Sequence, residues 1–192
     1  MLKIGITGGI GSGKSVVSKI LESLQFPVFY SDSVAKQILN NDLEVRQRLI
    51  DLFGDGIYEN DRLNKELLAT IIFSDDQARL EVNRMVHPMV RKAFDAFASN
   101  QNASLVFNEA AILFETESNK YFDKVILVTA PEELRIERVM KRDEVSKQEV
   151  AARMDKQWGD SKKESLADFI LVNNGKKPLL VETERIVEQL IN

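Results

Sequence analysis

Residues 8–15, Gly-Gly-Ile-Gly-Ser-Gly-Lys-Ser, restrict the possible folds of this chain more than any other segment. They match the pattern G-x-x-x-x-G-K-[S/T] and directly follow the apolar run 3–7. Glycines allow consecutive backbone N–H groups to turn inward around an anion, which is the geometry of a phosphate-binding loop. Such a P-loop connects a buried strand to the N-terminus of a helix, so we predict a parallel strand at 3–7 and an amphipathic helix after residue 15.

The residue types of this loop indicate a nucleotide ligand. The Lys14 ammonium supplies a point charge for β- and γ-phosphates, and the Ser15 hydroxyl is a hard oxygen ligand for Mg²⁺. We therefore expect ATP as co-substrate and Mg²⁺ bound at Ser15. The residues predicted to hold the nucleotide phosphates are Gly8, Gly9, Gly11, Ser12, Gly13, Lys14, Ser15 and Val16.

The composition excludes several other classes of protein. The chain has 192 residues, of which 44% are hydrophobic and 29% charged, as is typical of one globular domain. It has no cysteine and one histidine, which excludes disulfides, thiolate metal sites and multi-histidine metal sites. The net charge of −4 argues against non-specific binding to nucleic acid or to a membrane surface. With no signal segment and no apolar stretch of roughly 20 residues, we expect a cytoplasmic enzyme.

Apolar strands alternate with amphipathic helices, which predicts an α/β fold with a five-stranded parallel sheet between two helical layers. The expected strands are 3–7, 26–30, 105–107, 124–129 and 168–172. Residues 31–100 are mainly helical and too long for a simple crossover, so we interpret them as an inserted subdomain that holds a second substrate. The remaining core comprises 1–30, 101–137 and 159–192, with a lid at 138–158.

Within the insertion we predict helices at 43–53, ended by Gly54, and at 63–72. Residues 55–62 are expected to form a loop. The spacing of Ser74 and Gln77 is that of a capping box and predicts a third helix. Pro88 should break or kink that helix. The neighbouring His87 either contacts the second substrate or has only a structural role at the kink.

Asp32 lies where a predicted strand ends and a helix begins, and ligands bind at the carboxyl ends of parallel strands. Two interpretations compete. The residue is an N-terminal acid favoured by the helix dipole, or it accepts a hydroxyl proton during phosphoryl transfer. Position alone favours the first. Glu109 and Glu115 follow another predicted strand, and either could order a Mg²⁺-bound water or the second substrate, or merely cap a helix.

The helix expected after Pro131 ends in a basic run that contains Arg135, Arg138, Lys141 and Arg142. Cations favour helix C-termini, which is a sufficient structural reason for the run. Because the same chain carries a P-loop, we favour a lid whose arginines, Arg138 and Arg142, neutralise the transferring phosphoryl group. A capping box at 146–149 predicts the next helix of this lid.

Among P-loop classes, a small-molecule kinase explains both the insertion and the basic lid. A GTPase switch would need Asn-Lys-x-Asp, which the segment 119–123 misses by one residue, and no D-x-x-G follows the third predicted strand. A transport ATPase would need a Ser-Gly-Gly signature, which is absent. The kinase interpretation is therefore favoured, and a non-kinase NTPase switch is the weaker alternative.

A series of segments in order along the chain resembles the dephospho-CoA kinase family from end to end. These segments are 7–15, 31–36, His87-Pro88, 112–115, 138–143, Arg153 with Gln157, 167–168 and 173–175. The resemblance implies ATP-dependent phosphorylation of the ribose 3′-hydroxyl of dephospho-CoA, the last step of coenzyme A synthesis. It also implies a nucleotide-kinase-like core with an acceptor-binding helical subdomain and a lid.

The resemblance implies further residue roles. Asp32 matches the catalytic base of the family segment D-x-D-x-x-A-[R/K]. The residues expected to bind the acceptor are Asp32, His87 and Glu115, and Asn174 is expected near the adenine of ATP. Three positions differ from the residues usual in the family: Tyr30 stands where the first Asp of that segment is usual, Lys36 where Arg is common, and Ala111 where Pro is usual. The implied partners are ATP and dephospho-CoA. The sequence leaves the oligomeric state open, with a monomer as the default, and another P-loop nucleotide or small-alcohol kinase is the alternative.

Overall fold

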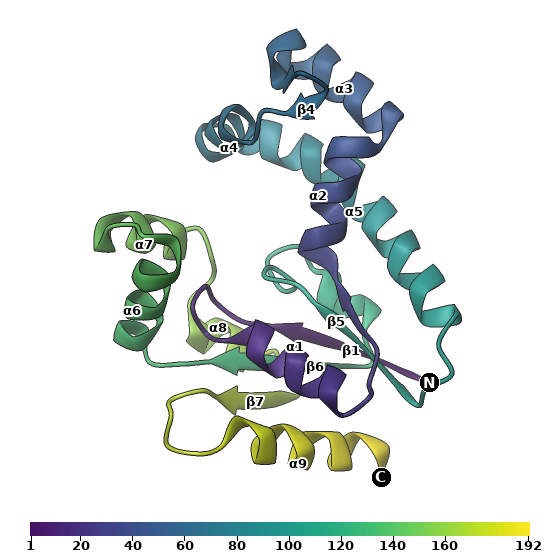
Figure 1. Ribbon diagram of the computed structural model, residues 1–192, viewed down its shortest axis with the longest axis vertical. Helices are drawn as coiled ribbons and strands as arrows, with labels where there is room; N and C mark the ends of the chain where they lie inside the picture. Colours follow the sequence, from purple (N-terminus) through teal and green to yellow (C-terminus); the bar gives the residue numbers. More distant parts are fainter. The chain divides into compact units, whose positions relative to one another are not determined.

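Five parallel strands form the main sheet, in the order β2-β5-β1-β6-β7 (Figure 1). In this computed structural model, which describes residues 1–192, the strands are β1 (Leu2–Thr7), β2 (Val28–Tyr30), β5 (Leu105–Glu109), β6 (Lys124–Thr129) and β7 (Phe169–Val172). The predicted parallel sheet is thus confirmed. The strand expected at 26–30 is shorter because Pro27 has no N–H to donate, although its carbonyl still accepts a hydrogen bond from Phe107.

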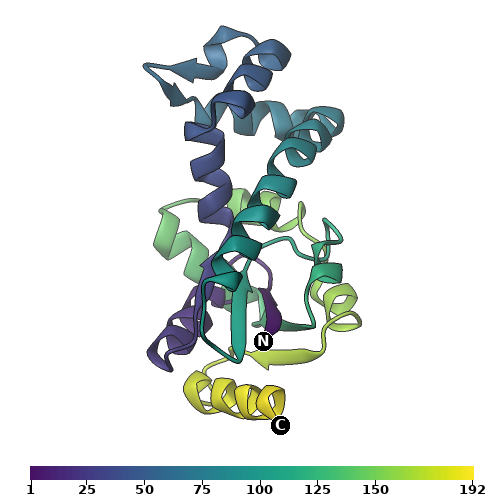
Figure 2. The ribbon, with the colours of Figure 1, turned by 90° about the vertical axis from the view of Figure 1, so that its right-hand side faces the viewer.

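Helices cover both faces of this sheet, as expected for a three-layer α/β fold. Helices α1 (Lys14–Ser23) and α9 (Leu179–Ile191) share one apolar cluster with Ile4, Ile6 and Ile126. Val125 belongs to a second cluster with Leu113 and Phe114. Because consecutive strand residues point to opposite faces, the neighbours Val125 and Ile126 show that the two clusters lie on opposite sides of the sheet. Figure 2 shows α9 next to the edge strand β7, as in Figure 1.

Two compact units divide the chain. The first comprises Met1–Tyr30 and Asn100–Asn192, and it contains the sheet, α1, α9, α6 (Glu132–Asp143), α7 (Lys147–Met154), α8 (Asp160–Glu164) and the short η2 (Ser118–Tyr121). The second comprises Ser31–Ser99. Its role as an acceptor-binding insertion, and the lid at 138–158, stay predictions. No helix in either unit combines the length and the apolar character that crossing a bilayer requires.

The second unit is built from four helices around its own apolar core. These are α2 (Ser31–Asn41), α3 (Leu43–Phe53), α4 (Lys65–Ser74) and α5 (Asp76–Ser99). Asp42 caps α3 by accepting a hydrogen bond from the Val45 N–H, and Gly54 ends it with a φ of 86°. The core includes Val45, Leu49, Ile57, Leu68, Val82 and Val86.

Two local predictions in this unit were wrong. The expected loop contains η1 (Asp55–Ile57) and a hairpin of β3 (Tyr58–Glu59) and β4 (Arg62–Leu63), whose turn residues Asn60 and Asp61 both have positive φ. Asp75 rather than Ser74 caps α5, since its carboxylate accepts from two N–H groups while the Ser74 hydroxyl donates within α4.

Of the two outcomes expected at Pro88, a break does not occur, because α5 continues through it. Val82 and Val86 before the proline and Met89 and Val90 after it all belong to one apolar cluster. Burial on both sides offsets the hydrogen bond that proline removes, so the helix is not broken.

We predict that Leu49→Ala lowers the free energy of unfolding by about 2–5 kcal/mol, because Leu49 is fully buried and the truncation leaves a cavity. Leu52→Ala on the same helix is the matched control, and since Leu52 is half exposed its cost should be about 0.5 kcal/mol or less. Urea denaturation of both variants measures the difference. Equal costs would contradict the core described for this unit.

Candidate active site

The predicted P-loop connects β1 to α1, as the motif requires. Gly11 and Gly13 have φ values of 78° and 97°, in the left-handed region that glycine adopts without steric cost. Helix α1 has neither a side-chain cap nor an acidic residue in its first turn. The positive end of its dipole is therefore directed at the loop with no carboxylate competing for it, which favours an anion.

At both positions, neighbouring groups also leave no room for a side chain. A Cβ at Gly11 would lie 2.5 Å from the backbone oxygen of Arg135, and a Cβ at Gly13 would lie 2.2 Å from Nδ2 of Asn173. Both distances are far below van der Waals contact. The loop is therefore packed tightly against residues more than a hundred positions away in the sequence.

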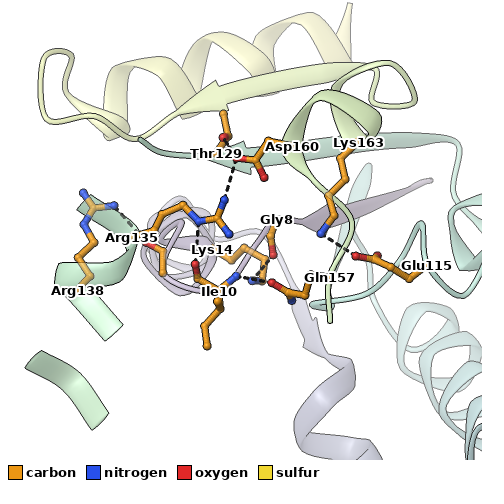
Figure 3. A network of polar contacts seen from close by, with 11 residues as sticks. Gly8, Ile10, Lys14, Glu115, Thr129, Arg135, Arg138, Gln157, Asp160 and Lys163 are labelled. Atoms are coloured by element: carbon orange, nitrogen blue, oxygen red, sulfur yellow. Dashed lines mark hydrogen bonds and ion pairs between the residues drawn. The ribbon is translucent and has the colours of Figure 1, made fainter. Parts of the chain in front are cut away.

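Side chains from those distant segments bind the outward-facing carbonyl groups of the loop (Figure 3). Nε of Arg135 donates to the Ile10 oxygen at 2.9 Å, and Nη1 of Arg138 donates to the Gly11 oxygen at 3.4 Å. Nδ2 of Asn173 donates to the Ser12 oxygen at 2.9 Å. These contacts fix the three peptide units whose N–H groups belong to Gly11, Ser12 and Gly13, and the Ser12 N–H itself donates to the Gly9 oxygen at 3.1 Å.

On the loop itself, Nζ of Lys14 donates to the Gly8 oxygen at 2.8 Å. The ammonium group thus folds back over the loop. Two residues beyond Gly8, the Ile10 N–H donates to Oε1 of Gln157 at 2.8 Å.

Arg135 is the buried cation of this site, with 8% of its side chain exposed. Its Nη1 lies 3.0 Å from Oδ2 of Asp160, and the same oxygen accepts a hydrogen bond from the Thr129 hydroxyl at 2.7 Å. The ion pair compensates the cost of burying the guanidinium. Sequence reasoning placed Arg135 only within a basic run, named Gln157 only as part of the family resemblance and did not single out Asp160. No local pattern marks the contacts of these residues with the loop, because the contacts are all long-range.

The two predicted lid arginines have different surroundings. Besides the loop, Arg138 contacts Asn173, donating from Nη2 to its backbone oxygen and to Oδ1, each at 3.3 Å. Arg142 is exposed and forms a two-pronged pair with Asp143, which also binds Arg153. The guanidinium of Arg142 lowers the pKa of Asp143, with Arg153 adding to the effect. The capping box of α7, Ser146 with Glu149, is formed as predicted.

Asp32 and His87 belong to the second unit. Asp32 lies in the first turn of α2, which begins directly where β2 ends, so both interpretations of its role remain compatible with its place in the chain. His87 lies within α5, where burial and then the neighbouring Arg91 lower the pKa of its imidazole.

Glu115 and Asn174 lie in the first unit. Oε1 of Glu115 is 2.8 Å from Nζ of the fully buried Lys163 and accepts a hydrogen bond from the Trp158 N–H at 3.1 Å. Asn174 follows β7 in a turn, and its side chain accepts from the Lys176 N–H at 3.0 Å. The structure thus brings Arg138 and Asn173 to the P-loop, whereas the Asn174 side chain binds within its own turn.

Tyr30 ends β2 and is paired in register with Glu109 at the end of β5. Burial, and then a hydrogen bond to Glu22, raise the pKa of the Tyr30 phenol to about 12. The position where the resembled family has a carboxylate therefore carries a neutral hydroxyl in this chain at physiological pH.

A family model for dephospho-CoA kinase matches residues 2–179. The chain is 43% identical over 189 residues to a dephospho-CoA kinase of Porphyromonas gingivalis, covering 98% of this chain and 94% of the relative. It is 38% identical over 187 residues to a dephospho-CoA kinase of Bacteroides fragilis, with coverage of 97% and 91%.

Solved structures agree with this match. A Thermus thermophilus protein aligns with a TM-score of 0.86 and 35% identity over 99% of this chain and 96% of its own. A dephospho-CoA kinase from Campylobacter jejuni aligns with a TM-score of 0.70 and 26% identity, with coverage of 98% and 96%. Shikimate kinase from Acinetobacter baumannii, at 14% identity and a TM-score of 0.57, shares the fold alone.

We predict that the Tyr30 phenol releases its proton near pH 12, about two units above an ordinary tyrosine. The phenolate absorbance of the protein minus that of Tyr30→Phe isolates this group during a pH titration. Glu22→Gln should shift the midpoint toward 10, because it removes the charged hydrogen-bond partner. A midpoint near 10 in the unsubstituted protein would contradict the described surroundings of Tyr30.

The same shift has a defined effect on stability. Between pH 10 and 12 the unfolded chain has lost this proton while the folded chain keeps it, so the free energy of unfolding should fall as pH rises through this window. The fall should be smaller in Tyr30→Phe.

Proposed function

This chain belongs to the dephospho-CoA kinase family, and from that premise we propose that it transfers the γ-phosphoryl group of ATP to the ribose 3′-hydroxyl of dephospho-CoA. The products are coenzyme A and ADP. The observation that carries the proposal is the P-loop, whose carbonyl groups are bound from outside and whose glycines are tightly enclosed, within a chain that matches this family over nearly its whole length.

ATP binds with its phosphates in the loop formed by residues 8–15 and its adenine near Asn174. Lys14 neutralises charge on the β- and γ-phosphates. Arg138 and Arg142 neutralise the phosphoryl oxygens as the lid closes, which also excludes water and limits hydrolysis of ATP. Arg138 already contacts the loop, which supports its role. Arg142 would have to leave Asp143 to take part.

A magnesium ion fits the residues present only when it arrives with the nucleotide. The chain contains no group of three or more His, Cys, Asp or Glu that could hold a metal ion by itself. The Ser15 hydroxyl, at the start of α1, is the oxygen that would bind Mg²⁺ together with the phosphates. The ion would supply positive charge for the developing transition state.

Asp32 is the proposed general base, which orients the acceptor hydroxyl and takes its proton as the new bond to phosphorus forms. An aspartate has the same chemical role in protein kinases. Its place directly after β2 supports the assignment, because ligands of parallel sheets bind at the carboxyl ends of strands. Tyr30 supplies no second carboxylate at this position.

We assign the acceptor to the second unit, with His87 as a contact. Lowering of the imidazole pKa keeps His87 neutral near pH 7, so it would act as a hydrogen-bond partner and not as a cation. Glu115 was also predicted to bind the acceptor. Its carboxylate is already engaged by Lys163 and the Trp158 N–H, so this assignment has the least support.

The identity of the acceptor as dephospho-CoA follows from the family and not from a residue pattern that would bind a pantetheine arm. Release of ADP, measured in a coupled assay with dephospho-CoA, AMP, CMP, dTMP, shikimate and gluconate, tests it. We expect turnover with dephospho-CoA to exceed all others. Faster turnover with a different acceptor would assign the chain to another kinase activity, and ADP release independent of any acceptor would indicate an NTPase.

We predict that Asp32→Asn reduces turnover by about 10²–10⁴-fold, the usual contribution of a general base, while the affinity for ATP stays near normal. Steady-state kinetics with ATP and dephospho-CoA measure the turnover, and equilibrium titration measures the affinity. Unchanged turnover would leave Asp32 with only a helix-terminal role.

Lys14→Ala should abolish most phosphoryl transfer, because it removes the ammonium group that neutralises the β- and γ-phosphates. Thermal unfolding is the control for intact folding, since Lys14 lies on the loop surface and not in the apolar core. Retained activity in a folded variant would mean that this loop is not the phosphate site.

A further inference from the structure

The side chain of Gln157 contacts the P-loop from the segment that follows α7. Its Oε1 accepts the Ile10 N–H at 2.8 Å, a contact between residues 147 positions apart (Figure 3). Because a backbone N–H can bond only to the oxygen of a carboxamide, this contact fixes which way the amide group is turned. The NH₂ group of Gln157 has no hydrogen-bond partner within the chain and remains a donor beside the loop.

This donor lies at the end of the loop that serves the terminal phosphates. Nζ of Lys14 rests on the Gly8 oxygen, and the lysine of a P-loop reaches the β- and γ-phosphates. Ile10, which holds Gln157, is only two residues beyond Gly8. Gln157 and the Lys14 ammonium thus both contact the segment from Gly8 to Ile10 (Figure 3). The Gln157 NH₂ group is therefore on the part of the loop where the terminal phosphates of a nucleotide bind.

The backbone around Gln157 is held at three points. The Gln157 N–H donates to the Met154 oxygen at 2.9 Å, which closes the end of α7. The Trp158 N–H donates to Oε1 of Glu115 at 3.1 Å, and Asp160 binds Arg135. Gln157 therefore meets the loop in a defined position and not as a mobile surface side chain.

The Glu115–Lys163 pair forms the buried part of this support. Lys163 is fully buried and its Nζ lies 2.8 Å from Oε1 of Glu115, whose side chain is 11% exposed. The two groups form an ion pair without an aligned hydrogen bond, because Nζ of Lys163 has no hydrogen-bond partner. The second carboxylate oxygen of Glu115, Oε2, has none either. Breaking such a pair leaves a buried charge uncompensated, so the pair holds Glu115 in place. Because Glu115 accepts the Trp158 N–H, the pair also fixes the position of Trp158.

We propose that Gln157 is a further catalytic residue, whose NH₂ group donates a hydrogen bond to an oxygen of the terminal phosphoryl group of the bound nucleoside triphosphate. Glu115 and Lys163 are positioning residues that act through the Trp158 N–H. The inference rests on the proposed kinase function. A neutral donor at this point complements Lys14, because the charge of the transferring group spreads over several oxygens. It also distinguishes a triphosphate from a diphosphate, which lacks the group contacted.

The test compares Gln157→Ala with Gln148→Ala, an exposed glutamine on α7, as matched control. Equilibrium titration measures the affinity of each protein for ADP and for an ATP analogue with a non-hydrolysable imido bridge. We expect Gln157→Ala to weaken binding of the analogue about tenfold or more, the size of a hydrogen bond to a charged group, with ADP affinity within about twofold. Gln148→Ala should change neither.

Turnover provides the second readout. Gln157→Ala should lower turnover by about tenfold or more and leave the KM of the acceptor unchanged. Gln157→Glu keeps an oxygen for the Ile10 N–H but places a carboxylate beside the phosphate. It should therefore lower the affinity for the analogue, relative to that for ADP, by more than Gln157→Ala does.

Equal losses of affinity for ADP and for the analogue in Gln157→Ala would show that Gln157 only shapes the loop, which would overturn the proposal. Unchanged affinities for both nucleotides would overturn it as well. Failure of the unsubstituted protein to bind ADP would instead refute the proposed function. Thermal unfolding of each variant confirms that it is folded.

Discussion

The anion site depends on how the peptide units of the P-loop are held from outside. A loop of glycines has many accessible conformations, and only those with several N–H groups directed inward bind phosphate. Here Arg135, Arg138 and Asn173 bind the carbonyl groups of three consecutive residues and thereby fix the opposite ends of those peptide units. The cost of ordering the loop is met by folding, before any nucleotide binds, which is the preorganisation that electrostatic catalysis requires.

The same contacts connect the loop to both ends of the predicted lid. Arg135 and Arg138 are on α6, before the lid helix α7, while Gln157 and Asp160 follow it. The Arg135–Asp160 ion pair joins these two ends to each other, and the hydrogen bonds to Ile10 join each of them to the loop. The loop and the residues that flank α7 are thus held together by these contacts.

The sequence predicted the parts of the molecule that depend on local residue pattern. The P-loop, the parallel sheet and the capping box of α7 each follow from a motif or a periodicity within a few residues. The hairpin at 58–63 was missed because its strands are only two residues long and its turn uses Asn60 and Asp61 instead of the usual Asn-Gly. Pro88 does not break its helix, because packing on both sides of it outweighs the local rule.

The candidate site shows the same division. Lys14 and the glycines are marked by the motif, whereas Arg135, Gln157 and Asp160 act through contacts that only the fold creates. Glu115 was chosen because it follows a strand, a position rule that cannot detect a buried partner such as Lys163. Asp32 and His87 remain predictions from the family resemblance and from their places in the chain.

The central claim is that a phosphoryl group passes directly from ATP, held in this loop, to a ribose hydroxyl. Phosphorus NMR of a single turnover with excess protein, ATP and dephospho-CoA tests it most directly. The account predicts a new phosphomonoester on the ribose 3′-position, formed in equal amount to ADP. Formation of ADP with inorganic phosphate alone, or a phosphoryl group on any other atom of the acceptor, would contradict it.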